Sequence, residues 1–321
     1  KLAKDYKTAG QTFLFLTNKF PQDSMAFRAI GFAATTYDSI PDKPLAARTY
    51  ELALQKYPDH PQTPSYLFNA CLTYEEAKMV EDAIRCNKTL ASKYKNSSYA
   101  LDAAFSIPKA YEAGSRWEEA AAAWVDFFRN FTSDKEKLIA AHYGAATSYQ
   151  KLKKTNEELA QWRILLEVYD KHGLQLNIDP RVAAEAAFML AQDKANAFTA
   201  KKIEGANAKA KEKVFTALGK ELQEVVSLYV RSAAYNSEQW TFKATNEIGN
   251  LFVEMSAKVR NQEFKGNAEQ VFVERITVVQ TLPTFYEQAR NFFEKNIQLA
   301  REQGYYNKDV INAEDGYIEM F

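Results

Sequence analysis

The sequence predicts an all-α fold in which antiparallel helix pairs stack into a solenoid. Only 11 Gly and 9 Pro occur in 321 residues, and this scarcity favours long helices with few turns. An aromatic residue closes successive amphipathic runs at spacings of 37, 37, 37 and 38 residues: Phe20, Tyr57, Tyr94, Phe131 and Tyr169. A second ladder recurs in phase, at spacings of 37, 37 and 38: Tyr37, Tyr74, Tyr111 and Tyr149. Two ladders with one period predict repeats of about 37 residues, each a helix pair.

Residues 1–175 are expected to hold these repeats, the first of them incomplete. Residues 1–20 have the pattern of the second helix of a pair, so we expect the natural protein to extend upstream. The following helix pairs are expected at 24–38 with 43–57, 63–78 with 80–94, 98–113 with 115–131, and 134–152 with 155–172.

Local signals support these boundaries. Ser115, Ser133 and Thr155 each precede a glutamate by three residues, which is the spacing of a capping box at a helix start. Gly114 follows an expected helix end, where a left-handed residue is common. Pro108 falls inside an expected helix, and we expect a kink there.

Residues 176–321 lose the strict period and favour longer helices. These are expected at 181–202, 207–235, 240–260, 268–281, 283–302 and 308–321. No low-complexity linker or charge block separates the two halves, so we expect the helix pairs to continue from one half into the other.

The first complete repeat, residues 26–58, has small residues and aromatic residues in a distinctive order: Ala34, Tyr37, Ala46, Tyr50, Ala53 and Tyr57-Pro58. This order resembles the tetratricopeptide repeat (TPR) family, and the resemblance implies a right-handed superhelical solenoid that binds a protein or peptide. The period and the segment 50–61 are similar to bacterial periplasmic and outer-membrane TPR lipoproteins and envelope-assembly scaffolds.

Composition excludes several classes of function. Lys and Arg number 41, and Asp and Glu also number 41, so no basic field is available to bind nucleic acid. No apolar run reaches the roughly 18 residues that a membrane span needs, so any membrane tether is expected in a missing N-terminal segment. His60, His142 and His172 lack metal-ligand spacing, and no phosphate-binding loop or Gly-flanked nucleophile occurs. We therefore expect no metal, no cofactor and no enzymatic activity.

In the TPR family the first helix of each pair lines a concave groove. Positions counted from the second tyrosine ladder predict a binding groove of Arg28, Phe32, Phe68, Asn69, Phe105, Lys109, Tyr143 and Thr147. Aromatic rings supply contact area, and Asn69 and Lys109 can hydrogen-bond a peptide backbone. The alternative is that Phe68, Phe105 and Tyr143 pack against the neighbouring first helix. Rings that are less than about 10 % exposed would favour this packing.

Cys71 and Cys86 flank the hairpin turn expected near residues 78 and 79, at similar heights on opposite helices. A disulfide between them is geometrically possible, and an oxidising periplasm would permit it. Two buried free thiols are the alternative.

The expected function is a non-enzymatic scaffold that binds a partner peptide or helix within a bacterial envelope, in the periplasm or at the outer membrane. One alternative is a cytoplasmic TPR adaptor, which reduced and buried cysteines would favour. The other is a helical-toroid glycan-processing enzyme, which needs carboxylates converging in a deep cleft.

Overall fold

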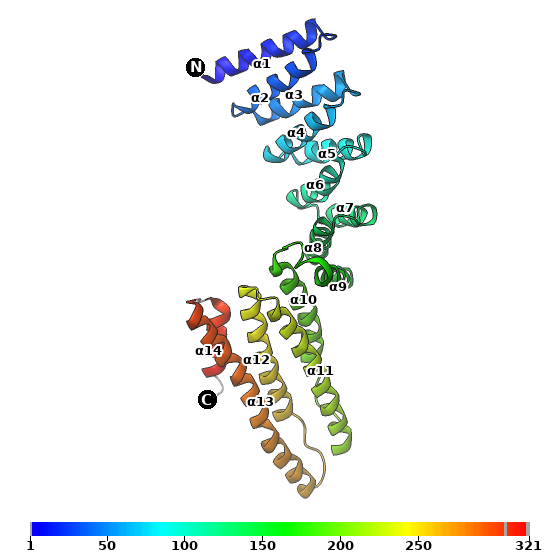
Figure 1. Ribbon diagram of the computed structural model, residues 1–321. Helices are drawn as coiled ribbons and strands as arrows, with labels where there is room; N and C mark the ends of the chain where they lie inside the picture. Colours follow the sequence, from blue (N-terminus) through cyan, green and yellow to red (C-terminus); the bar gives the residue numbers. More distant parts are fainter. Residues whose placement is uncertain (1, 305–306, 319–321) are drawn as a thin grey trace. The chain divides into compact units, whose positions relative to one another are not determined.

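The computed structural model describes residues 2–304 and 307–318, with side chains from residue 5 onward, and every regular element in these ranges is a helix (Figure 1). The chain divides into two compact units, residues 1–158 and 159–321. The predicted all-α fold of helix pairs is confirmed for the described residues, and each unit is treated by itself below.

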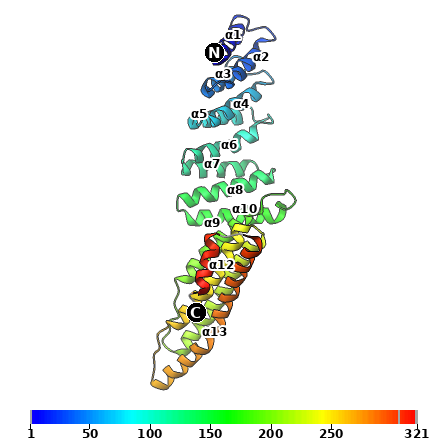
Figure 2. The same ribbon diagram turned by 90° about the vertical axis from the view of Figure 1, so that its left-hand side faces the viewer.

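The first unit is a stack of helix pairs (Figure 2). Helix α1 (Leu2–Lys19) comes first. Three helix pairs follow: α2 (Ala26–Asp38) with α3 (Lys43–Lys56), α4 (Thr63–Glu76) with α5 (Val80–Lys93), and α6 (Ala100–Ala113) with α7 (Trp117–Asn130). The unit ends with α8 (Lys135–Lys151) and the start of α9 (Thr155–His172). From α1 to α8, each helix packs against the next one along the chain. In addition α4 contacts α6, and α6 contacts α8. The helices α4, α6 and α8 are therefore neighbours in succession, as a solenoid requires.

The second tyrosine ladder closes the hairpin turns. The carbonyls of Tyr74, Tyr111 and Tyr149 each accept a hydrogen bond from the backbone N–H five residues later. This bond pattern needs a left-handed residue just after the helix, and that position is filled by Lys78, Ser115 and Lys153, with φ of 57°, 56° and 57°. One turn geometry thus recurs with the period of the repeat.

Two expectations about these turns are wrong. Gly114 ends α6 at φ −84°, and the left-handed residue is Ser115, which therefore cannot cap α7. The start of α8 is capped by Asp134, whose carboxylate accepts from the N–H of Lys137, and not by Ser133. In both cases the helix begins one residue later than the sequence pattern predicts.

The first aromatic ladder joins successive repeats. The hydroxyl of Tyr57 donates to the carbonyl of Pro21 at 2.9 Å, and the hydroxyl of Tyr94 donates to the carbonyl of Pro58 at 2.8 Å. Each bond links the end of a second helix to the loop of the preceding repeat. Phe131 stands at the next position of the ladder and has no hydroxyl to make this bond.

Cys71 in α4 and Cys86 in α5 form a disulfide, with their Cα atoms 5.3 Å apart. Both residues are buried, at 1 % and 0 % exposed, among the apolar side chains between the two helices. The bond therefore fixes one helix pair across its interior.

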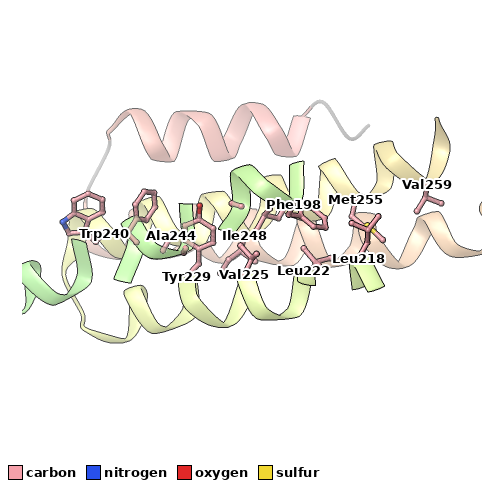
Figure 3. Close-up of a cluster of buried hydrophobic side chains, with 14 of the residues drawn as sticks. Phe198, Leu218, Leu222, Val225, Tyr229, Trp240, Ala244, Ile248, Met255 and Val259 are labelled. Atoms are coloured by element: carbon pink, nitrogen blue, oxygen red, sulfur yellow. The ribbon is translucent and has the colours of Figure 1, made fainter. Parts of the chain in front are cut away.

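The second unit is built around α12 (Glu238–Arg260), which packs on α10 (Pro180–Thr199), α11 (Ala208–Ala234), α13 (Ala268–Gln303) and α14 (Lys308–Ile318). Its largest core lies between α10, α11 and α12 (Figure 3) and includes Phe198, Leu218, Leu222, Val225, Tyr229, Trp240, Ala244, Ile248, Met255 and Val259. None of the described helices is both long enough and apolar enough to cross a membrane.

Two prolines lie inside continuous helices. Helix α6 runs through the buried Pro108. Helix α13 runs through Pro283, so the two helices expected at 268–281 and 283–302 are one helix of 36 residues. Proline removes the hydrogen bond to the carbonyl four residues earlier, and near Pro283 that residue is Val279, which is 68 % exposed. The helix nevertheless continues through Pro283, as α6 does through Pro108.

Candidate functional site

The structure places the eight predicted groove residues on four helices of the first unit, α2, α4, α6 and α8. Arg28 and Phe32 lie on α2, and the others follow in twos on α4, α6 and α8: Phe68 and Asn69, Phe105 and Lys109, Tyr143 and Thr147. Arg28, Phe32 and Lys109 are exposed, and the remaining five residues are half-buried. None of the three rings that decide between groove contact and packing is fully buried, so each has surface left over.

Two of these rings also pack between helices. The Phe68 ring stacks on Tyr99 at a centroid distance of 4.9 Å. The Phe105 ring meets Trp124 and Phe127 of α7, edge to face, at 5.1 and 5.2 Å. Each ring is thus held in one orientation by its packing, and each remains partly exposed.

Polar groups accompany the rings. The Lys109 ammonium lies 5.4 Å from the centre of the Phe105 ring, four residues earlier on the same helix, and the Arg28 guanidinium lies 5.8 Å from the Phe32 ring. The side-chain amide of Asn69 makes no hydrogen bond to any residue that the structure describes, while the Thr147 hydroxyl donates to the carbonyl of Gly144. Asn69 is therefore able to hydrogen-bond a ligand.

Next to the predicted groove residues lies a surface that the sequence analysis did not predict. An apolar hollow of about 310 Å³ lies between α1 and α2, and its lining includes Phe32. We call it the α1–α2 hollow; its lining residues are Phe13, Leu16, Phe20, Asp23, Met25, Ala26, Ala29 and Phe32. Phe20, Met25 and Phe32 are 51 %, 48 % and 42 % exposed. Large apolar side chains gathered in this way mark interaction surfaces.

The rim of the hollow is cationic. The Lys19 ammonium lies 5.4 Å from the Phe15 ring and 5.5 Å from the Phe20 ring. Arg28 covers Phe32 as described above. Asp23, the acidic residue of the lining, is engaged with the backbone N–H of Met25 at 2.8 Å. Two cations, Lys19 and Arg28, and one carboxylate, Asp23, therefore stand at the hollow, and its charge is positive on balance.

The sequence held one signal for this hollow. Residues 13–16 read Phe-Leu-Phe-Leu, and one face of a helix cannot bury four consecutive apolar side chains. Phe13 and Leu14 pack towards the core beside Tyr37, while Phe15 and Leu16 are exposed. The divided run indicates a helix with a second apolar face.

The adjacent acidic residues Glu118 and Glu119 of α7 do not act together. Glu118 lies 3.7 Å from Lys154, and Glu119 lies 2.8 Å from Arg116. Across the described parts of the chain, no three His, Cys, Asp or Glu side chains are grouped so as to hold a metal ion.

Comparison with known proteins gives structural likenesses alone. No family model matches the sequence, and no curated protein matches it. A tetratricopeptide repeat protein from Parabacteroides merdae is similar at 15 % identity and a TM-score of 0.40, over 92 % of this chain and 98 % of that one. The apo form of RapI is similar at 12 % identity and a TM-score of 0.40, over 92 % and 97 %. The TPR2AB domain of yeast Sti1, in complex with an HSP90 peptide, is similar at 15 % identity and a TM-score of 0.32, over 89 % and 98 %. The TPR-like description of this chain rests on its own repeat of about 37 residues and on the helix pairs that carry it.

Proposed function

We propose that this TPR-like chain is a non-enzymatic protein-interaction scaffold whose first unit binds a peptide or helix of a partner protein. The observation that carries the proposal is that Phe32 belongs both to the lining of the α1–α2 hollow and to the predicted groove residues on α2, α4, α6 and α8. A partner segment seated in the hollow can extend along Phe68, Phe105 and Tyr143.

The surface is suited to binding because it is apolar and already ordered. Covering an exposed Phe or Met side chain contributes about 1.5–3 kcal/mol when burial is complete. Phe68 and Phe105 are held by packing against Tyr99, Trp124 and Phe127, so little side-chain freedom is lost when a ligand binds.

The partner that fits best is an amphipathic segment with aromatic or aliphatic side chains on one face and acidic residues beside them. Lys19 and Arg28 stand over the rings of the hollow, and Lys109 stands over Phe105. Carboxylates of a partner would approach these cations while its apolar face covers the rings.

We also propose an envelope location, in the periplasm or at the outer membrane of a bacterium. The support is the Cys71–Cys86 disulfide, because disulfides persist in oxidising compartments and are rare in the cytosol. Two reduced thiols in protein isolated from its native cell would instead favour the cytoplasmic adaptor.

Peptide selection on the purified chain tests the binding proposal. A random peptide library displayed on phage is expected to yield sequences that combine aromatic residues with Asp and Glu. A selected peptide is then titrated against wild type, Phe32→Ser, and the triple variant Phe68→Ala, Phe105→Ala, Tyr143→Ala. We expect Phe32→Ser to weaken binding by about tenfold or more, since loss of a central aromatic anchor costs over 1 kcal/mol.

The matched control is Leu174→Ser, because Leu174 is 87 % exposed and lies in the other unit. Circular dichroism checks that every variant remains folded. Equal affinity of a selected peptide for wild type, Phe32→Ser and the triple variant would exclude this surface as the binding site.

A further inference from the structure

A second apolar surface lies in the other unit, on α11, α12 and α13. A trough of about 700 Å³ runs there, with α11 and α13 as walls and the end of α12 as floor. Figure 1 shows the N-terminal halves of α11 and α13 beside the C-terminal half of α12. The apolar residues that line this α11–α13 trough are Ile203, Ala208, Phe215, Val259, Val273 and Val278.

An ion pair crosses the base of the trough and joins its two walls. Lys211 of α11 and Glu274 of α13 lie 2.8 Å apart, with side chains 6 % and 15 % exposed. The Lys211 ammonium also donates to the carbonyl of Glu263. The ion pair therefore holds α11 and α13 together at the base of the trough, and the space above it remains open.

A ridge runs along the outer side of α13, next to the trough. Phe272, Ile276 and Val279 follow at intervals of four and three residues, so they lie on one face of the helix. They are 64 %, 41 % and 68 % exposed, and the neighbouring Val273, 57 % exposed, belongs to both ridge and trough. One stretch of helix thus presents an apolar ridge beside an apolar recess.

The charges at the rim are balanced and unpaired. Lys209 and Glu212 are exposed on α11, and Glu269 and Arg275 are exposed on α13. Within the described residues none of these four makes an ion pair, although Arg275 lies 5.5 Å from the Phe264 ring. A rim with as many anions as cations selects neither an acidic nor a basic partner. It is complementary to a copy of itself, in which each cation can face an anion.

We propose that this face is a homodimer interface, in which the ridge of α13 from one copy lies in the α11–α13 trough of a second copy. A two-fold arrangement places the same patch on both subunits, so one copy must supply both ridge and recess, and this chain does. Both ridges then become buried together.

The available area is consistent with a stable dimer. The four ridge side chains offer roughly 400 Å² of apolar surface, if a full aromatic ring counts about 200 Å² and a branched aliphatic chain somewhat less. A standard interface buries about 800 Å² on each partner. The trough lining and the rim residues add further area to the contact.

Sedimentation velocity on the full chain tests the proposal, over a range of about 1 to 100 µM, where interfaces of this size associate. Wild type is expected to approach twice the chain mass of 36.5 kDa as concentration rises. The double variant Ile276→Glu, Val279→Glu is expected to remain monomeric, because the interface would bury its carboxylates without partners. Val279→Lys serves as a second, single-site ridge variant.

Leu174→Glu is the matched control, since it adds a charge at an exposed apolar position of the same unit away from the ridge. It is expected to dimerise like wild type, and circular dichroism verifies folding of all variants. Wild type that stays monomeric throughout the range overturns the proposal, even if the monomer captures another protein through the ridge. A dimer that persists in both ridge variants also overturns it, because the contact then lies elsewhere.

Discussion

Removing the Cys71–Cys86 disulfide should lower the stability of the first unit by about 3 kcal/mol. The two cysteines are separated by 15 residues in sequence. Closing a loop of this length in the unfolded chain removes about 10 cal/mol/K of entropy, which corresponds to about 3 kcal/mol at 25 °C. The cross-link therefore stabilises the fold mainly by restricting its unfolded state.

The expected shift in melting temperature follows from the size of the unit. For a unit of about 150 residues, each kcal/mol corresponds to about 2–4 °C, so loss of the bond should lower the Tm by about 6–12 °C. Because both sulfur atoms are buried, a reductant reaches them only when the α4–α5 pair opens. The reduced sample should therefore be prepared by unfolding in reductant and refolding.

Thermal melts followed by circular dichroism compare oxidised wild type, reduced wild type and the variant Cys71→Ala, Cys86→Ala. The variant is the control, since its Tm should not respond to reductant. Alkylation under denaturing, non-reducing conditions, read by mass spectrometry, should label neither cysteine of the oxidised protein. Labelling of both thiols, or identical melting of oxidised and reduced wild type, would refute the reasoning.

Three further predictions concern the repeats. Tyr94→Phe removes the hydroxyl that donates to Pro58 and should cost about 1 kcal/mol in urea unfolding; an unchanged midpoint would show that this bond does not hold neighbouring repeats together. Lys153 has a left-handed backbone with φ of 57°, which glycine adopts without strain, so Lys153→Gly should raise the free energy of unfolding by about 1 kcal/mol in the same urea experiment. A lower free energy of unfolding would contradict this source of strain. Burial raises the pKa of Glu112, so the folded state holds the proton more tightly and stability should fall as pH rises from the unfolded pKa through the raised folded value. Glu112→Gln keeps an oxygen acceptor for the indole N–H of Trp124 and should flatten this part of the Tm–pH profile, and a profile that still slopes like wild type would assign the effect to another group.

The candidate site could be predicted only in part. The repeat period assigned Phe68, Phe105 and Tyr143 to successive first helices, because one position in each repeat recurs on one face of the stack. It could not tell how much of each ring is covered. That depends on side chains from other helices, such as Trp124 against Phe105.

The α1–α2 hollow could not be predicted for a related reason. Counting from the tyrosine ladder assigns residues to first helices alone. One wall of the hollow, however, comes from Phe13 and Leu16 of α1 and from Phe20 just after it, before the first complete pair. The run Phe13 to Leu16 indicated excess apolar surface, but only the packing of Phe13 beside Tyr37 decided which of its side chains stay exposed.

The sequence by itself determined the helical class, the repeat of about 37 residues and the helix pairs, because these depend on periodicity and on local propensity along the chain. Tertiary structure decided the details that depend on neighbours in space. Ser115 rather than Gly114 is left-handed because its turn closes on the Tyr111 carbonyl. Helix α13 continues through Pro283, although proline removes one backbone hydrogen bond. The ridge of α13 and the trough beside it exist because of which helices pack around α12, and that arrangement is not encoded in any single segment.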